Sequence, residues 1–359
     1  MSKLIYGVAM SGGVDSSVTA ALLQKEGFNI FGVTMKIHDN CDQAIEDAQI
    51  ICKKLGIEHF VLDIKKQFKE KIIETFVNYY AQGLTPNPCA FCNRDIKMNL
   101  LLNFVKENGA DLMATGHYAN IQVAGDSVIL TEAVCQKRDQ SYFLSLVSKN
   151  NLKYVRFPLG QMASKNETRA IAESFNMHNF KKKDSQDICF IPSNDYKTFL
   201  KNYSTNINLF APGNVILKNN QQIIGKHLGI ANYTVGQRKG LGISHSNPLY
   251  VVEVNPQKNE IIVDVKEALN KINLNVNNVN WIIDMPSKFT ALIKLRSVCD
   301  KIQAQVEKFS NDAISITLME LTKVPVTPGQ VCCLYNELTH AVIGAGIISY
   351  HQHDVNRSA

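Results

Sequence analysis

The chain has 359 residues, more than one hydrophobic core usually serves, so two or three domains are expected. Its 45% hydrophobic and 19% charged residues are ordinary for a soluble globular protein, and no apolar run approaches the roughly 20 residues that span a bilayer. A net charge of +6 permits an acidic partner without requiring one. The first residues do not form a signal peptide, so we expect a soluble, cytoplasmic protein that contacts no membrane.

The chain contains nine cysteines, an odd number, and carries no export signal. A structural disulfide framework is therefore not expected, and reduced thiols are the starting assumption. Any disulfide in this protein should be transient and part of its chemistry.

The first 200 residues alternate short apolar runs with helical patterns. Strands are expected at Ile5–Met10, Asn29–Lys36, His59–Asp63 and Asp111–Thr115, and helices at Ser17–Lys25, Asp42–Leu55, Gln67–Gln82 and Arg94–Val105. Asp42 is expected to cap its helix, and Ser164 with Glu167 forms a capping box that starts a later helix. The alternation predicts βαβ units and a doubly wound parallel sheet.

After about residue 200 the pattern changes to short alternating strands separated by turns. Val251–Val254 and Ile261–Val263 are expected to pair as a hairpin, and no helix is expected from about Ile272 onward. We therefore predict an α/β catalytic domain over residues 1–203, a small β-rich central domain over 204–270 and a C-terminal β-barrel over 271–359. Residues 351–359 resemble a frayed tail.

The segment Ser11–Ser17, SGGVDSS, lies between the first strand and the first helix. Its two glycines allow the backbone to approach a phosphate, and the helix that follows directs free N–H groups at the anion. A lone SGG is often only a turn, but this placement is far more specific. The loop resembles the pyrophosphate loop of the ATP-pyrophosphatase superfamily, which implies ATP, a pyrophosphate leaving group and Mg²⁺. Asp15 is unexpected there unless a metal ion or a helix cap recruits it.

Two further residues lie at the carboxyl ends of predicted parallel strands, where open α/β sheets bind ligands. They are Met35 and Gly116. Met35 is either a core residue or a contact for adenine.

Cys89 and Cys92 lie in the proline-braced segment TPNPCAFCN, which enters a predicted helix. A cysteine at a helix amino terminus has its pKa lowered by the helix dipole. A CxxC pair can also be half of a zinc site, but no second pair completes four ligands, so we predict no metal site.

Cys189 follows the basic run Lys181–Lys183 within an apolar CFI sequence. The lysines would favour its thiolate, whereas the apolar neighbours would suit a core residue. The other six cysteines are expected to serve packing or to be incidental; they are Cys41, Cys52, Cys135, Cys299, Cys332 and Cys333.

Three short basic clusters lie beside these motifs: Lys137–Arg138, Lys181–Lys183 and Arg238–Lys239. Each alone would be solvated surface. Their positions beside chemical motifs make an RNA-binding role the alternative.

Taken together, the motifs resemble the bacterial tRNA-specific 2-thiouridylase family from end to end. The matching segments are AMSGGVDSS, TPNPCAFCNRDIKMN, ATGHYA, KRDQSYFL, KKKDSQDICFI, YTVGQRKGLGI and VTPGQ. The resemblance implies ATP-dependent 2-thiolation of the wobble uridine of tRNA, position 34, with sulfur supplied by a sulfur-carrier protein.

The resemblance also assigns roles to matching positions. It implies that Cys92 is the nucleophile, that Cys189 carries a persulfide, and that the two form a disulfide during the reaction. The residues matched to the ATP site are Ala9, Met10, Ser11, Gly12, Gly13, Val14, Asp15, Ser16, Met35 and Gly116. The residues matched to the target base or to tRNA are Asn87, Pro88, Cys89, His117, Arg138, Asp139, Gln140, Arg296, Ser297 and Gln330. Some relatives carry Asp at the position of Cys89, and a thiol there would act differently from a carboxylate.

Three other functions remain as alternatives. The chain could be another synthetase of the ATP-pyrophosphatase superfamily, acting on a small molecule. Cys89, Cys92 and Cys189 could instead ligate an iron–sulfur cluster. The third alternative is a non-catalytic RNA-binding protein regulated by ATP.

Overall fold

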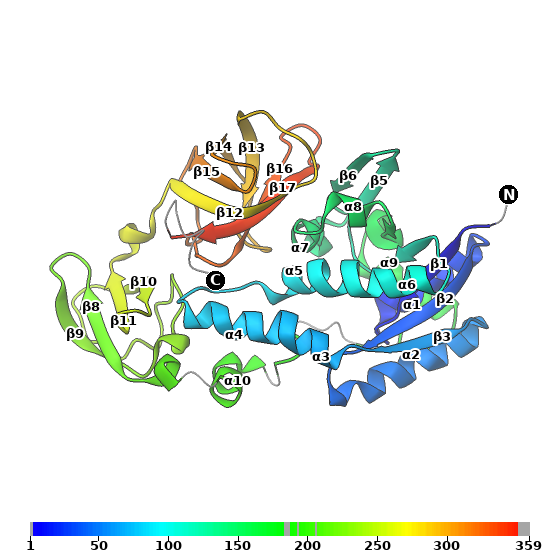
Figure 1. Ribbon diagram of the computed structural model, residues 1–359, viewed down its shortest axis with the longest axis horizontal. Helices are drawn as coiled ribbons and strands as arrows, with labels where there is room; N and C mark the ends of the chain where they lie inside the picture. The colour runs from blue at the N-terminus through cyan, green and yellow to red at the C-terminus, as the bar shows by residue number, and fades with distance from the viewer. Residues whose placement is uncertain (1–2, 183–186, 192–193, 205–206, 351–359) are drawn as a thin grey trace.

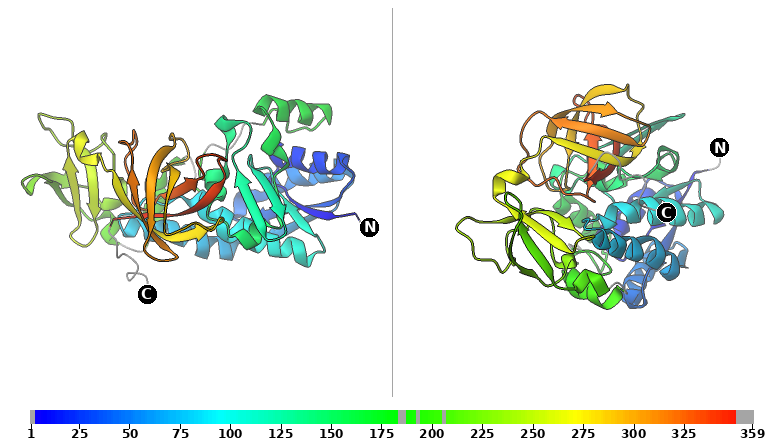
Figure 2. Two further views of the ribbon diagram at one scale, coloured as in Figure 1. Left: turned by 90° about the horizontal axis from the view of Figure 1, so that it is seen from above. Right: turned by 60° about the vertical axis from the view of Figure 1, so that its left-hand side comes forward.

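The computed structural model describes residues 3–182, 187–191, 194–204 and 207–350. The predicted tail at 351–359 and Lys183 lie outside the described residues. An α/β part and a small β-rich part lie at opposite ends of the molecule, and a β-barrel lies between them (Figures 1 and 2). The predicted fold class is confirmed.

The amino-terminal part is built on a five-stranded parallel sheet in the order β3-β2-β1-β4-β7. Its strands are β1 (Ile5–Ala9), β2 (Asn29–Lys36), β3 (His59–Asp63), β4 (Leu112–Ala114) and β7 (Val155–Arg156). The chain moves outward from β1 to β3 and then returns to β4, so the winding reverses between β1 and β4. Ligands bind at this point in doubly wound sheets, at the carboxyl ends of the strands.

Helices cover the sheet, and η marks the 3-10 and π-helical segments among them (Figure 1). In the first half of this part they are α1 (Val14–Lys25), η1 (Asp39–Cys41), α2 (Asp42–Leu55), α3 (Lys65–Phe68), η2 (Lys69–Ile73), α4 (Glu74–Ala81), α5 (Pro88–Cys92), η3 (Asn93–Leu101) and α6 (Leu102–Glu107). Two predicted helices are thus longer than expected and contain a π-helical segment. The second of them begins at Pro88 rather than Arg94, so it includes both cysteines of the CxxC pair.

The rest of this part contains a two-stranded hairpin and several short helices. They are β5 (Asn120–Ala124), β6 (Ser127–Thr131), η4 (Gln136–Arg138), α7 (Ser141–Leu144), α8 (Lys149–Leu152), η5 (Pro158–Gln161), α9 (Lys165–Ser174) and α10 (Tyr196–Tyr203).

The two predicted helix caps differ from expectation in detail. Cys41, not Asp42, is the residue before α2, and the Asp42 carboxylate accepts a hydrogen bond from Lys36 Nζ at 3.1 Å. Ser164 Oγ caps α9 by accepting from Glu167 N, as predicted. The Glu167 carboxylate accepts from Ala163 N at 2.7 Å, one residue before the position that a capping box prescribes.

The central part has a four-stranded sheet in the order β10-β11-β8-β9. Its elements are η7 (Ile207–Phe210), β8 (Gly213–Leu217), β9 (Gln222–His227), η8 (Ile230–Asn232), β10 (Tyr250–Asn255), β11 (Glu260–Asp264) and η9 (Lys266–Leu269). The predicted hairpin is confirmed, because Val251 lies opposite Val263 and Val254 lies opposite Ile261.

The last part is a closed six-stranded barrel in the order β12-β15-β14-β13-β16-β17. Its strands are β12 (Asn273–Trp281), β13 (Lys288–Lys294), β14 (Ile302–Lys308), β15 (Ala313–Leu318), β16 (Val331–Tyr335) and β17 (Val342–Ser349). In β14 buried and exposed residues alternate, so one face of this strand fills the barrel. Among the described residues no helix is both long and apolar enough to span a membrane.

Candidate active site

The loop Ser11–Ser16 joins β1 to α1 at the carboxyl edge of the sheet. Gly12 has φ +68°, and a side chain there would come within 2.5 Å of the Ala44 carbonyl oxygen, so only glycine fits. Ser16 Oγ accepts from Ser11 N at 3.1 Å and donates to the Gly13 carbonyl at 3.1 Å, which closes the loop. No side chain caps α1 at Gly13, so the first N–H groups of this helix remain available to an anion.

The other residues predicted for the nucleotide site surround this loop. Gly116 packs directly on it, since a Cβ at Gly116 would lie 2.9 Å from Ser16 N. Met10 and Val14 are buried in the core, so they can offer a ligand their backbone alone. Ala9 ends β1, and Met35 is part-buried in β2 against the core.

Asp15 does not point to an open anion site. Both of its carboxylate oxygens accept hydrogen bonds from Lys165 Nζ at 2.8 Å, and Tyr118 Oη donates to Oδ1 at 2.9 Å. The Lys165 side chain is 8% exposed. The unexpected carboxylate therefore fastens the loop to α9 through an ion pair whose lysine is buried and whose carboxylate is half-buried, and sequence reasoning did not find this pair.

Cys89 and Cys92 lie in the first turns of the helix that begins at Pro88. Asn87 Oδ1 caps this helix by accepting from Ala90 N at 3.2 Å, and Pro88 occupies its first position, where no N–H is needed. Cys89 is exposed and Cys92 is half-buried.

Cys189 is an exposed residue held by two buried neighbours. Phe190 packs edge-on against Phe68 and Phe76, and Ile191 is 4% exposed. The apolar CFI sequence therefore anchors the segment in the core while Cys189 itself stays at the surface.

The structure brings the three predicted thiols into one electrostatic neighbourhood. Burial raises the pKa of the Cys92 thiol to about 12; Lys97 opposes this rise, and repulsion from Cys189 and Cys89 adds to it. Burial raises the pKa of Cys189 to about 11, with a further contribution from Cys89. Solvent reaches Cys89 and Cys189, but the dense protein around each sulfur removes much of its hydration. We expected the helix dipole to lower the pKa of Cys89 and Cys92, and this expectation is wrong for the protein without bound substrates.

Lys97 is a site residue that sequence reasoning missed. Its positive charge lowers the pKa of Cys89, Cys92 and Cys189, and it also acts on His117 at the end of β4. It follows Cys92 by five residues in the helix, and the π-helical segment η3 has the corresponding i→i+5 hydrogen bonds. The π-helical segment could not be foreseen from the spacing of apolar residues.

All nine cysteines lie within the described residues and carry free thiols. The disulfide between Cys92 and Cys189 that the family resemblance implies is thus not present. The described residues also contain no cluster of three His, Cys, Asp or Glu side chains suited to hold a metal ion.

The comparisons with known proteins cover nearly the whole chain. Residues 5–193 match the tRNA methyl transferase HUP domain, 197–264 the tRNA methyl transferase PRC-barrel domain, and 271–348 the Aminomethyltransferase beta-barrel domain. The chain is 42% identical to the tRNA-specific 2-thiouridylase MnmA of Trichlorobacter lovleyi, over 97% of this chain and 98% of that protein. It is 40% identical to the enzyme of that name from Rickettsia africae, over 95% of this chain and 96% of the relative.

The chain belongs to the tRNA-specific 2-thiouridylase family.

Several residues that the family resemblance matches to tRNA form hydrogen bonds within this protein. Gln330, in the barrel, donates from Nε2 to the carbonyl oxygens of Thr85 at 2.9 Å and Pro86 at 3.1 Å. His117 is buried and bonds to Thr115 Oγ1 at 2.7 Å, and burial lowers its pKa well below the ordinary value, so it is neutral.

Asp139 and Gln140 are likewise internal partners. The Asp139 carboxylate accepts from Ala133 N at 3.0 Å and from Ser141 Oγ at 2.8 Å, and the same hydroxyl lies 3.0 Å from Tyr335 Oη in the barrel. Gln140 Oε1 accepts from Tyr118 N at 2.9 Å. These side chains shape the loop that carries Lys137 and Arg138.

Arg296 and Ser297 follow strand β13 of the barrel. Arg296 donates to Thr327 Oγ1 at 2.6 Å, and burial lowers its pKa. Ser297 is half-buried beside it.

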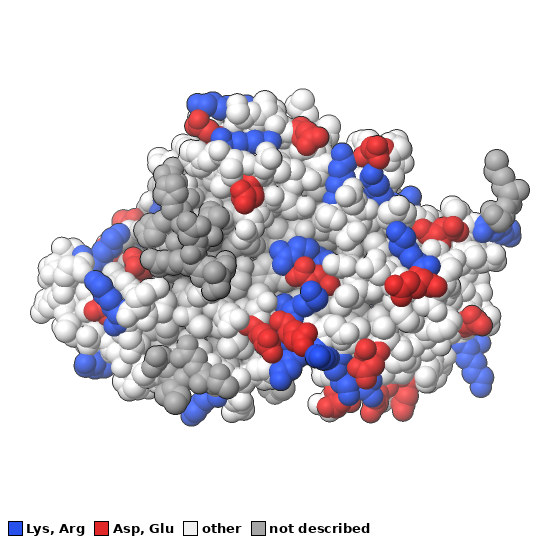
Figure 3. Space-filling view, in the orientation of Figure 1, with Lys and Arg blue, Asp and Glu red and all other residues white. Residues whose placement is uncertain are grey.

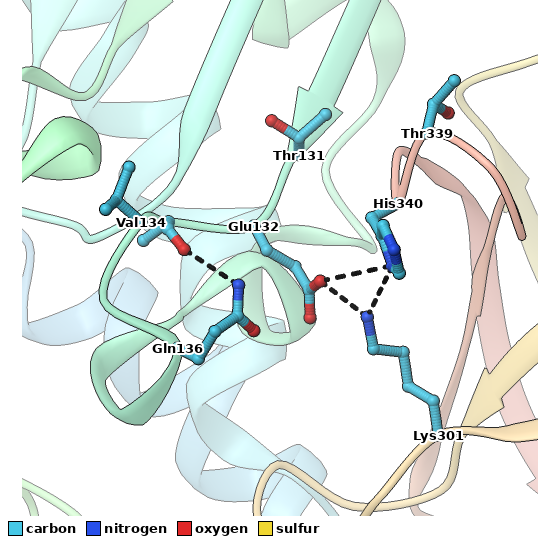
Figure 4. A pocket seen from close by; sticks show the side chains of 8 residues that line it. Thr131, Glu132, Val134, Gln136, Lys301, Thr339 and His340 are labelled. Atoms are coloured by element: carbon cyan, nitrogen blue, oxygen red, sulfur yellow. Dashed lines mark hydrogen bonds and ion pairs between the residues drawn. The ribbon is translucent and has the colours of Figure 1, made fainter.

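An open pocket of about 480 Å³ lies where the barrel meets the loop after β6. Glu132, Lys301 and His340 converge there, and Lys301 Nζ lies 2.6 Å from Glu132 Oε2 (Figure 4). The Glu132 side chain is 7% exposed, and this largely buried ion pair joins the α/β part to the barrel. Sequence reasoning did not find it.

Proposed function

We propose that this protein is an ATP-dependent tRNA sulfurtransferase that replaces O2 of the wobble uridine with sulfur and releases AMP and pyrophosphate. One observation carries the proposal, and it links the thiols to the glycine loop. The positive charge of Lys97 lowers the pKa of Cys92, Cys189 and His117. Gly116, the residue before His117, packs on Ser16 of the glycine loop. These observations support a site in which the thiols and the nucleotide loop share one end of the sheet. Domain boundaries after residues 203 and 270 remain our proposal, as does a cytoplasmic location.

In the first step the glycine loop, with Met35 and Gly116, would hold ATP while uracil O2 attacks the α-phosphorus. The free N–H groups at the start of α1 stabilise the phosphates. Mg²⁺ bound with ATP would neutralise charge on the leaving pyrophosphate. The described residues offer it no carboxylate cluster, and Asp15 is already paired with Lys165, so such an ion would be held mainly by phosphate and water.

In the second step a persulfide on Cys189 would attack C2 of the adenylated uracil, and AMP would leave. Cys92, as thiolate, would then attack the Cys189 sulfur, which breaks the sulfur–sulfur bond, leaves one sulfur on the base and forms a Cys92–Cys189 disulfide. A thiol reductant would reopen that disulfide. The raised pKa of Cys92, about 12, means that the resting enzyme holds this thiol protonated.

The tRNA must present an unstacked wobble base, because the thiols cannot reach a base inside a stack. We propose that Asn87, Pro88 and Cys89 contact that base and that Arg138, Arg296 and Ser297 contact the anticodon arm. Basic and acidic side chains alternate over much of the face in Figure 3, so phosphate contacts would be local rather than spread over this face. A sulfur-carrier protein would load Cys189, and the exposure of this residue supports such access.

Mass spectrometry of nucleosides tests the proposal directly. Purified protein, tRNA, ATP and a persulfide donor should yield 2-thiouridine at position 34, and Cys92→Ser or Cys189→Ser should abolish it. Cys135→Ser, at a half-buried thiol that the mechanism does not use, should keep wild-type yield. Full thiolation by either serine variant would refute the mechanism. An iron–sulfur cluster, for which the described residues show no group of three ligands, would appear as visible absorbance in anaerobic protein.

A further inference from the structure

Lys182 lies on the glycine loop rather than free on the surface. Its Nζ is 3.3 Å from the Gly12 carbonyl oxygen and 2.6 Å from Asp47 Oδ2. The side chain is nevertheless 43% exposed, so the ammonium is both anchored and accessible. In the sequence Lys182 is merely the middle of a basic run, and nothing in the mechanism above uses it.

The segment before Lys182 is fixed to the same loop. Asn179 Nδ2 donates to the Gly12 carbonyl at 3.2 Å and to Ser17 Oγ at 3.0 Å, and Lys182 N donates to the Asn179 carbonyl at 2.8 Å. Asn179 is 4% exposed, and its Oδ1 has no hydrogen-bond partner among the described residues. A turn that starts at the buried Asn179 therefore places Lys182 at the loop, and the Asn179 Oδ1 acceptor lacks a partner among the described residues.

The other carboxylate oxygen of Asp47 has partners besides Lys182. Its Oδ1 also accepts from Gln43 Nε2 at 3.1 Å and lies 3.4 Å from His178 Nε2. Burial acts to raise the pKa of the Asp47 carboxyl, but hydrogen bonds from Lys182, Gln43 and His178 outweigh it, so the pKa is lowered and the carboxylate is ionised. Asp47 is thus held ionised by several donors, and Lys182 can contact a new anion while it stays paired with this carboxylate.

The position of Asp47 makes a cation necessary when phosphate binds. A Cβ on Gly12 would lie 3.0 Å from Asp47 Cβ, so this carboxylate borders the loop. Two negative groups this close repel strongly unless a cation lies between them. An ammonium has three N–H donors, and the two contacts to Gly12 and Asp47 leave one for a phosphate oxygen.

We propose that Lys182 is a ligand for the pyrophosphate part of ATP, and that Asp47 holds its ammonium on the glycine loop before the nucleotide arrives. The proposal rests on the ATP-dependent function above and names one more residue of that site. The pyrophosphate part is the partner because it carries most of the negative charge of ATP and because the glycine loop is the element expected to hold it.

Isothermal titration of the full-length protein without tRNA tests this, with ATP, inorganic pyrophosphate and AMP as separate probes. Lys182→Met should weaken ATP and pyrophosphate binding by roughly 10- to 100-fold, the value of one charge-assisted hydrogen bond, and change AMP binding less than about twofold. Lys182→Arg should retain most of the affinity. The matched control is Lys181→Met, since Lys181 lies over the Phe180 ring, and it should bind all three probes as wild type does.

The outcomes separate this inference from the function on which it rests. Unchanged pyrophosphate binding in Lys182→Met, or an equal loss in Lys181→Met, would overturn the inference and leave ATP-dependent thiolation untouched. Failure of the wild-type protein to bind ATP would overturn both. Wild-type AMP binding and an unchanged thermal melt in Lys182→Met would show that the variant is folded.

Discussion

Gln330 Nε2 and the Thr85 carbonyl oxygen are 2.9 Å apart although 245 residues separate them in the chain. Thr85 N donates in turn to the Pro328 carbonyl at 2.9 Å. A turn of the barrel therefore holds the segment that leads into α5 and Cys92. The barrel therefore contacts the segment just before the helix that carries Cys89 and Cys92.

Gln330→Ala should lower kcat of thiolation by about 10-fold or more, because a small displacement of a reacting group is costly. If Gln330 acted only by touching tRNA, KM for tRNA would rise and kcat would be unchanged. Steady-state kinetics separates the two. Gln303→Ala is the control, since Gln303 makes a comparable bond to Glu337 at 2.8 Å on the barrel surface.

Lys97→Met should slow alkylation of Cys92 and Cys189. Lys97 lowers the pKa of both thiols, so its removal raises their pKa further and reduces the thiolate present at any pH below it. One pKa unit changes the thiolate fraction by about tenfold, and a several-fold loss is expected. Iodoacetamide rates by peptide mass spectrometry measure this. Lys106→Met, over the Tyr154 ring, should alkylate at the wild-type rate, and equal rates for both variants would contradict the assignment.

Lys165→Met should lower the free energy of unfolding by about 3 kcal/mol, because it leaves the Asp15 carboxylate without its buried cation. Urea denaturation followed by circular dichroism is the measurement. Lys36→Met, which removes an exposed pair with Asp42, should cost less than about 1 kcal/mol. If both variants lose the same free energy of unfolding, burial does not make the Lys165 pair stronger than the Lys36 pair.

Asp139→Asn should alter how stability depends on pH. Burial raises the pKa of Asp139 above its ordinary value, so the folded state favours the protonated acid. The stability that this pKa shift contributes is fully present below the pKa of Asp in the unfolded state, near 3.9. It is lost as pH rises through the pKa of Asp139 in the folded state. The variant cannot ionise, so its stability relative to wild type should increase over that interval. Urea denaturation at several pH values measures the free energy of unfolding of both proteins. If the two free energies differ by the same amount from pH 4 to 7, the prediction is contradicted.

Strands and domain order were predictable from the sequence because they follow from repeating patterns. The bounds of β2 and β3 agree with the prediction, since each is an apolar run with β-branched or aromatic residues. The helix around Cys92 was misplaced, because its start depends on the Asn87 cap and its π-helical segment on packing. The Asp15–Lys165 and Glu132–Lys301 pairs could not be foreseen, because each joins residues that only the folded chain brings together.

The anchoring of Phe190 among aromatic rings has a consequence for how sulfur enters the protein. The side chain after Cys189 is fixed in the core while Cys189 is open to solvent. Under the proposed function, a donor protein that loads Cys189 would need no rearrangement of the core beneath. Selectivity among donors would then depend on the shape and charge of the surface around Cys189, and exchanging that surface between relatives would exchange their donors.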